Sequence, residues 1–194
     1  SCGNRSGAPL DAAQGGHGAF DLLRPRLLPS ALTVDHFGRQ LVVRAESDRR
    51  LIATHLDAGG NEVERVIASA TVGIQHIDVV FLGAARALAV WSESSLTEAA
   101  VSVLMRQGLQ SAVDDLARAQ VLRYAYFDGS SWSAPALVDV AQVGVGKPRL
   151  AACKPDFSDF IACGRVSSAF LVWEYDRNRN IAAPDIEIHG AEFV

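Results

Sequence analysis

The chain has 194 residues, a formal charge of −4, and 49% hydrophobic residues. These values are typical of one soluble domain, or of one compact piece of a larger protein. The 18 basic and 22 acidic side chains are spread along the chain, so we expect no basic patch of the kind that binds nucleic acid. The apolar runs are far shorter than the roughly 20 residues of a membrane-spanning helix, so we expect no membrane span.

The beginning of the sequence differs in composition from the rest. It starts Ser1-Cys2-Gly3 without an initiator Met, and residues 1–28 are rich in Gly and Ala. We therefore expect a processed chain, or one cut from a longer product. In this interpretation residues 1–28 form an N-terminal segment or linker, and residues 29–194 form the folded domain.

Three segments of the chain align without gaps. Each runs from a large apolar residue to an Asp six positions later, at 51–57, 122–128 and 170–176. A polar turn rich in Gly, Ser or Asn follows each segment, which predicts a strand and then a hairpin turn. Another extended run follows each turn, and two of these runs contain Ala-Pro, which an edge strand tolerates.

A second predicted hairpin precedes each aligned segment, so the repeated unit is four consecutive antiparallel strands. The preceding strand pairs are 32–35 with 40–45, 77–82 with 87–92, and 149–153 with 160–165. The three units cover about residues 29–72, 73–141 and 146–190. A repeated four-stranded unit of about 45 residues is typical of a β-propeller blade.

The apolar pattern of the strands indicates how these units pack. In 87–91 and 170–173 neither face of the strand is polar, so each sheet requires cover on both sides. Neighbouring blades supply such cover, but known propellers need at least about four blades to close a ring. We therefore predict an all-β, propeller-like domain that is part of a larger ring, completed by a protein partner or by the remainder of the same polypeptide.

The turn after residue 126 resembles a known family. Tyr-Phe-Asp-Gly-Ser-Ser-Trp at 126–132, followed by Ser-Ala-Pro, resembles the strand–turn–strand corner of sialidase-like and fucose-lectin-like β-propellers with Asp-box turns. In that family the Asp caps the turn and the Trp packs between sheets, so the resemblance implies architecture and transfers no reaction. The structural turn residues that it implies are Asp128, Gly129 and Trp132, with Asp57 and Asp176 at the matching position of the other two turns.

Residues 95–120 interrupt the middle unit and lack strand alternation. Their content of Ala, Leu, Glu, Gln and Arg predicts helix, with a capping box of Ser95 and Glu98, a stop at Gly108 and a second short helix from Ser111. This helical insertion covers a neighbouring blade, binds a partner, or forms a lid over an active site. The candidate partner-binding side chains are Leu96, Val101, Leu104, Met105, Leu109, Val113 and Leu116.

The cysteines leave two interpretations open. Cys153 and Cys163 lie on strands predicted to pair in one hairpin, where a cross-strand disulfide would suit a secreted or cell-envelope protein. The alternative is two small thiols buried in the core. No C-x-x-C pair occurs, so we expect no thiolate metal site.

Residues that commonly carry catalysis form no recognisable pattern. The five histidines are scattered singly and no G-x-S-x-G motif is present, so we expect no catalytic residue, no metal and no cofactor. A sialidase-like hydrolase would need arginines, a tyrosine and acids in an arrangement that the sequence does not show. Glycan binding is the stronger competitor, because Trp91, Tyr126 and Trp173 are aromatic residues of the kind that stack on sugars.

The sequence thus favours a noncatalytic, extracytoplasmic interaction or scaffold module that completes or docks onto a larger protein assembly. The alternative is a carbohydrate-binding lectin or a sialidase-like glycoside hydrolase. Retention on a glycan column would distinguish the lectin from the assembly subunit.

Overall fold

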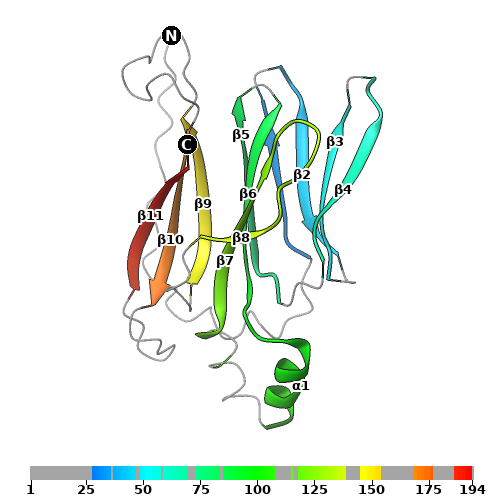
Figure 1. The fold of residues 1–194 in the computed structure, drawn as a ribbon. Helices are drawn as coiled ribbons and strands as arrows, with labels where there is room; N and C mark the ends of the chain where they lie inside the picture. The colour runs from blue at the N-terminus through cyan, green and yellow to red at the C-terminus, as the bar shows by residue number, and fades with distance from the viewer. Residues whose placement is uncertain are drawn as a thin grey trace, which may run out of the picture.

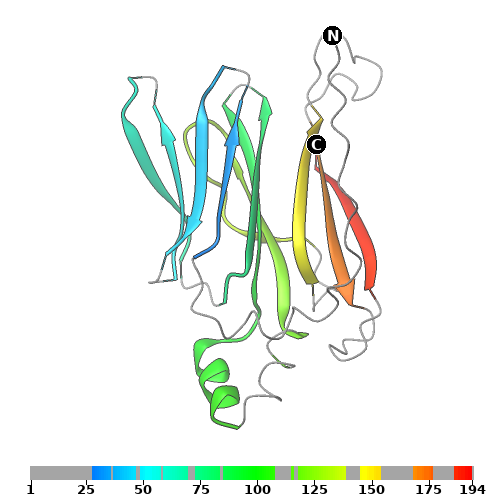
Figure 2. The ribbon, with the colours of Figure 1, turned by 180° about the vertical axis from the view of Figure 1, so that it is seen from behind.

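The computed structural model describes residues 28–35, 37–46, 49–57, 59–69, 73–83, 85–107, 115, 118–138, 145–153, 168–176 and 186–193. These residues form three antiparallel sheets and one α-helix (Figure 1). The sheets lie side by side as three layers, with the second sheet in the middle, and the view from behind shows the same order (Figure 2). The described part of the fold is therefore almost entirely β.

Consecutive strands pair as neighbours in each sheet. Sheet 1 has the order β1-β2-β3-β4, sheet 2 the order β5-β6-β7-β8, and sheet 3 the order β11-β10-β9. The strand bounds are β1 Ser30–Val34, β2 Gln40–Ala45, β3 Leu51–Leu56, β4 Glu62–Ala68, β5 His76–Gly83, β6 Arg86–Ser94, β7 Gln120–Phe127, β8 Ala136–Leu137, β9 Val145–Cys153, β10 Ser168–Asp176 and β11 Ile186–Phe193.

The third sheet differs from the predicted unit. The sequence pattern predicts a strand at 160–165 between β9 and β10, but β10 pairs directly with β9, with Ser168 opposite Cys153 and Leu171 opposite Leu150. In this register the backbone groups along one edge of β9 are hydrogen-bonded to β10, so no other strand can lie between β9 and β10. Segment 160–165 lies outside the described residues. Sheet 3 therefore contains three described strands instead of the predicted four.

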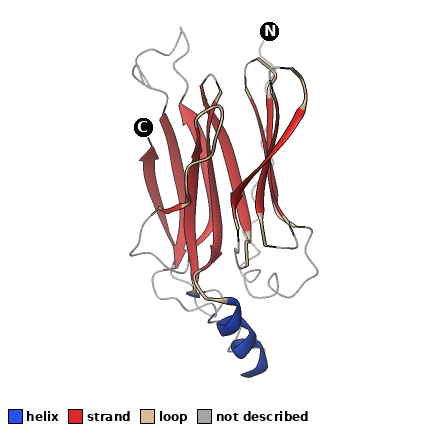
Figure 3. Ribbon diagram, turned by 45° about the vertical axis from the view of Figure 1, so that its right-hand side comes forward, coloured by secondary structure: helices blue, strands red, loops and turns tan. Residues whose placement is uncertain are grey.

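The helical part of the insertion is α1, Glu98–Gln107, which projects beyond one end of the strands (Figure 3). Its N-cap is Thr97, whose Oγ1 accepts a hydrogen bond from the amide of Ala100 at 3.3 Å. The predicted cap, Ser95, instead donates its amide to the carbonyl of Ala119 at 2.7 Å, where the insertion begins and ends. The predicted stop at Gly108 and the predicted start of the second helix at Ser111 lie outside the described residues. Asp115 and Arg118 are helical, and the amide of Ala119 donates to the carbonyl of Asp115 at 3.1 Å.

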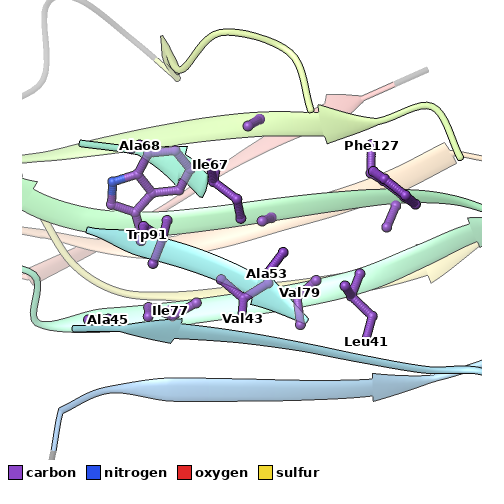
Figure 4. Packing of buried hydrophobic residues seen from close by; sticks show 14 of the residues in the cluster. Leu41, Val43, Ala45, Ala53, Ile67, Ala68, Ile77, Val79, Trp91 and Phe127 are labelled. Carbon is purple, nitrogen blue, oxygen red and sulfur yellow. The ribbon is translucent and has the colours of Figure 1, made fainter. Parts of the chain in front are cut away.

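Two hydrophobic clusters hold the three layers together. The first joins sheets 1 and 2 and includes Leu41, Val43, Val79, Trp91 and Phe127 (Figure 4). The second joins sheets 2 and 3, through residues that include Leu88, Val90, Leu171 and Trp173. Alternate residues of a strand face opposite sides of its sheet, so the middle sheet contributes one face to each cluster.

Strand β6 shows that the middle sheet is covered on both faces, as its sequence requires. All five residues of 87–91 are fully buried. Ala87, Ala89 and Trp91 pack toward sheet 1, whereas Leu88 and Val90 belong to the cluster with sheet 3. In sheet 3 the expectation fails on one face, because Phe170 and Val172 are 47% and 45% exposed.

Candidate functional site

Asp128 caps the turn after β7. Its Oδ1 accepts hydrogen bonds from the amides of Ser130 and Ser131, each at 2.8 Å, and both serine hydroxyls also donate to the carboxylate. The amide bonds, that of Ser131 first, hold the pKa of Asp128 well below its ordinary value. The neighbouring Gly129 has φ +104°, and a Cβ there would meet Ala85 at 3.3 Å, so glycine suits this position.

Asp57 caps the turn after β3 in a similar way. Its Oδ1 accepts hydrogen bonds from the amides of Gly59 at 2.8 Å and Asn61 at 2.9 Å. The hydrogen bonds from Asn61 lower the pKa of Asp57. Asp176 is the last residue of β10, and the turn that follows it lies outside the described residues.

Asp35 caps the predicted turn between β1 and β2, a role that the sequence reasoning did not assign to it. Its Oδ1 accepts hydrogen bonds from the amides of Phe37 and Arg39, each at 2.9 Å. The sequence signal is an Asp followed three positions later by Gly38, a spacing that Asp57 shares. In all three turns the carboxylate is engaged by its own hairpin, so these aspartates stabilise turns and supply no reactive group.

The aromatic residues predicted to stack on sugars do not form a surface together. Trp91 is fully buried toward sheet 1, and its Nε1 donates a hydrogen bond to Glu93 at 2.9 Å. Trp173 is 5% exposed in the other cluster, and half-buried Tyr126 packs against Tyr124 and Phe193. Neither tryptophan ring offers a face to a sugar, because both rings are used in the packing between sheets.

Trp132 packs against the first cluster, with its ring centroid 5.2 Å from that of Phe127. It is a partly buried residue at the edge of the cluster that joins sheets 1 and 2. The residues on the two sides of this turn are paired as in a hairpin, because Phe127 and Trp132 form an isolated antiparallel β-bridge. The residue is therefore part of the packing between sheets 1 and 2.

The insertion shows only part of its predicted partner-binding set. Leu96, Val101 and Leu104 are half-buried, and Val103, on the same helix, is 45% exposed. The side chains of the other four members, Met105, Leu109, Val113 and Leu116, lie outside the description. Arg49, between β2 and β3, donates a hydrogen bond to Glu98 at 2.8 Å, which ties the start of α1 to sheet 1.

The predicted cysteine pair is only half described. Cys153 ends β9 opposite Ser168, and Cys163 lies outside the described residues. No group of His, Cys, Asp and Glu side chains that could hold a metal ion occurs in the described part of the chain. Its helix is too short and too polar to span a bilayer.

A cleft of about 510 Å³ lies where β4 approaches β6 and β7. Glu93 and Arg123 line it, and the remaining lining residues are Val66, Ile67, Ala68, Ser69 and Pro135. The Nε of Arg123 donates to Oε1 of Glu93, whose other oxygen accepts the Trp91 hydrogen bond. Both oxygens of this buried carboxylate are thus engaged, so the cleft presents a fixed ion pair against an apolar wall.

Most of the exposed large hydrophobic side chains in the described part of the chain lie on the two outer surfaces of the stack. On sheet 1, strand alternation places four of them on the face turned away from sheet 2; on sheet 3, four lie on the face turned away from sheet 2. We call the first set the back end face: Leu32, Val34, Leu56 and Val66, 48–60% exposed. Val66 lies at the margin of this face, because it also borders the cleft beside β6 and β7. We call the second set the forward end face: Phe170, Val172, Ile186 and Ile188, 45–70% exposed.

The three aligned segments show which sides of the three sheets are equivalent. In each segment the side chains at the first and third positions point to the same side of their sheet, which we call the forward side; the opposite side is the back side. The pairs are Leu51 and Ala53, Leu122 and Tyr124, and Phe170 and Val172. In sheets 1 and 2 these positions pack toward the next sheet, whereas in sheet 3 they are exposed. The forward end face of sheet 3 is therefore equivalent to the forward sides of sheets 1 and 2, which are buried against the next sheet.

The charges on the end faces are mixed. Beside the back end face, Arg44 forms an ion pair with Glu64 and donates a hydrogen bond to Thr54 at 2.6 Å. The hydrogen bond from Arg44 lowers the pKa of Glu64. Beside the forward end face, Arg149 lies opposite Val172 and Glu174 lies opposite Ile188. Glu192, opposite Phe170, adds a second carboxylate to the forward side, and Glu62, opposite Leu56, adds one to the back side, so carboxylates outnumber arginines among these residues on both sides.

Comparisons with known proteins assign no family to this chain. No protein-family model matches the sequence, and no curated protein matches it significantly. The function must therefore be argued from the two end faces and from the packing of the sheets.

Proposed function

We propose that the chain is a noncatalytic interaction or scaffold module whose three sheets are blades of an open, propeller-like stack. In this proposal the back end face and the forward end face bind protein surfaces that continue the stack. One observation carries the proposal: sheet 2 is buried on both faces, whereas sheets 1 and 3 each leave an apolar face exposed. Contiguous exposed apolar patches mark interaction surfaces.

The arrangement of the first strands supports the propeller-like interpretation. Strand β1 lies against β5, and β5 lies against β9, so the first strands of the three sheets are neighbours. Asp78 of β5 bridges two of them, since its Oδ2 accepts a hydrogen bond from the amide of Leu150 at 2.9 Å. From these strands each sheet extends outward in chain order. Blades of a propeller share this order around a common centre.

The size of the apolar faces indicates that covering them is energetically important. Complete burial of a large aliphatic or aromatic side chain contributes about 1.5–3 kcal/mol. The forward end face holds four such side chains that are already about half buried, so covering it yields on the order of 3–6 kcal/mol before the entropic cost of association. This is comparable to or smaller than the roughly 4–15 kcal/mol that association costs, so a stable assembly requires that more than one end face be covered.

The extracytoplasmic setting is part of the proposal and rests on Cys153 and Cys163. A disulfide between them would indicate an oxidising compartment. A tryptic map without reductant tests this point, because a linked peptide supports export and two separate free-thiol peptides contradict it.

The experiment that tests the proposed function is a native mass measurement of the protein purified from its source, with intact-mass spectrometry of every chain present. An assembly larger than 20.7 kDa is the expected result. A monomer of 20.7 kDa whose end faces react freely with a hydroxyl-radical footprint would refute the proposal. Retention of that monomer on a glycan column would favour the lectin alternative instead.

A further inference from the structure

We infer that the surface that covers the end faces is a second copy of this chain. The forward end face of each copy packs on the back end face of the other, so that two copies form a closed ring of six sheets. This inference rests on the proposed function and specifies its partner. The partner is identified by the chemistry of the two faces and by the interfaces that already exist within the chain.

Continuity with the internal interfaces is the first argument. The contact between sheets 1 and 2 joins the forward side of one sheet to the back side of the next, and so does the contact between sheets 2 and 3. A third contact of the same kind requires one exposed forward side and one exposed back side. The chain has one of each, Phe170 and Ile188 belonging to the forward end face and Leu32 and Leu56 to the back end face.

The direction of this contact also follows from the internal interfaces. Because first strands lie against first strands within the chain, β9 of one copy would lie against β1 of the other. The two end faces differ in sequence, so the contact is head-to-tail, not between identical surfaces. Head-to-tail contacts form either closed rings or open filaments.

The area of the faces decides between a ring and a single open contact. Strands are spaced at about 4.8 Å and rise about 3.3 Å per residue, so each end face covers roughly 300–400 Å². One contact would bury only about 600–800 Å² in total, which is the size of a crystal-packing contact. A ring of two copies makes the contact twice and buries about 1,200–1,600 Å², which is the range of stable protein interfaces.

Charge does not drive this contact. Arg149 on the forward side lies on the same face as Glu174 and Glu192, and Arg44 on the back side lies on the same face as Glu62 and Glu64. Because carboxylates outnumber arginines among these residues on both sides, the contact must be held by burial of the apolar side chains.

The test is the mass of the purified full chain in solution, measured by light scattering after size exclusion from about 1 to 100 µM. We expect twice 20.7 kDa. The double variants F170E/I188E and L32E/L56E should each weaken the dimer by at least about 100-fold, because each places two charges in an apolar contact. The control V103E changes a side chain on α1 that is 45% exposed, and should leave the dimer intact.

Each other outcome overturns the inference. A wild-type monomer at every concentration excludes the second copy, and an open series of larger oligomers excludes the closed ring. Loss of the dimer in only one of the two double variants excludes head-to-tail pairing. If a glutamate variant fails to fold, thiol labelling of L32C and I188C replaces it: labelling that does not slow as the protein concentration rises contradicts the contact.

The failure of this inference is distinguishable from the failure of the proposed function. If the purified chain is a monomer, but the protein from its source carries a different chain in a larger assembly, the scaffold function stands and the second copy is excluded. If both preparations are monomeric, both proposals are excluded.

Discussion

The ion pair between Glu93 and Arg123 leads to an asymmetric prediction about stability. The side chain of Glu93 is only 9% exposed, whereas that of Arg123 is 32% exposed in the cleft beside β4. Replacing the arginine, as in R123M, removes the ion-pair partner of the buried Glu93 carboxylate. The Trp91 indole still donates a hydrogen bond to that carboxylate. Removing one partner of a buried pair typically costs 3–5 kcal/mol, and we expect about 3 kcal/mol here.

The reverse substitution should cost much less. In E93Q the amide oxygen still accepts the Trp91 hydrogen bond, and the guanidinium of Arg123 reaches water through the cleft. We therefore expect a loss of about 1 kcal/mol, which is typical of one hydrogen bond. The double variant E93Q/R123M should cost about 1–2 kcal/mol less than R123M and E93Q combined, because no uncompensated charge remains buried.

Urea unfolding followed by far-UV circular dichroism measures these differences at one fixed protein concentration. With a slope of about 2 kcal/mol per molar urea, the difference between R123M and E93Q corresponds to about 1 M in the midpoint. Equal losses in the two single variants, or a larger loss in E93Q, would refute the assignment of Glu93 as the desolvated partner.

Four further predictions concern the packing, the turns and the insertion. L171A removes a fully buried side chain between sheets 2 and 3 and should lower the free energy of unfolding by about 2–5 kcal/mol, measured in urea; a loss below about 1 kcal/mol would contradict tight packing there. Burial, followed by the charge of Arg65, lowers the pKa of His55, so stability that is complete above pH 6.5 should fall as the pH drops below that value, and the variant H55F should lose this dependence. Because hydrogen bonds from its own turn lower the pKa of Asp128, its contribution is complete above pH 3.8 and is lost under more acidic conditions; D128A should have a lower urea midpoint at pH 7 and a smaller change on acidification, and an unchanged midpoint would count against the cap. Replacing residues 97–118 with a short Gly-Ser turn should leave the far-UV spectrum of the sheets intact, since Ser94 pairs with Gln120 at the base of the insertion, whereas global unfolding would show that the insertion is part of the core.

Local sequence signals located most of the elements correctly. Strand β2 begins and ends at the predicted residues, and β3 and β7 differ from their predicted bounds by at most two residues. These signals are strong because alternation and turn residues act over a few neighbouring positions. The same locality explains the caps, since Asp57 and Asp128 bond to amides within four residues of themselves.

The candidate site was much less accessible to sequence reasoning. The pattern identifies aromatic residues but not which ones are buried, so Trp91 and Trp173 are candidates for sugar stacking in the lectin alternative, although both pack between sheets. Nor did it indicate the partnership of Glu93 with Arg123, which lie 30 positions apart. Such contacts depend on the register between strands, and a change of one residue would turn each side chain to the opposite face.

The sequence by itself determined that the chain is built from antiparallel hairpins with apolar residues on both faces, because strand alternation and turn chemistry are local properties. Only the tertiary structure decided that β10 pairs with β9, that sheet 2 is covered on both sides, and that one apolar face of sheet 1 and one of sheet 3 stay exposed. The physical reason is that burial results from contacts between distant segments. Apolar residues in a strand indicate that a face of the sheet is stabilised by burial, but the packing of the sheets determines which faces are actually buried.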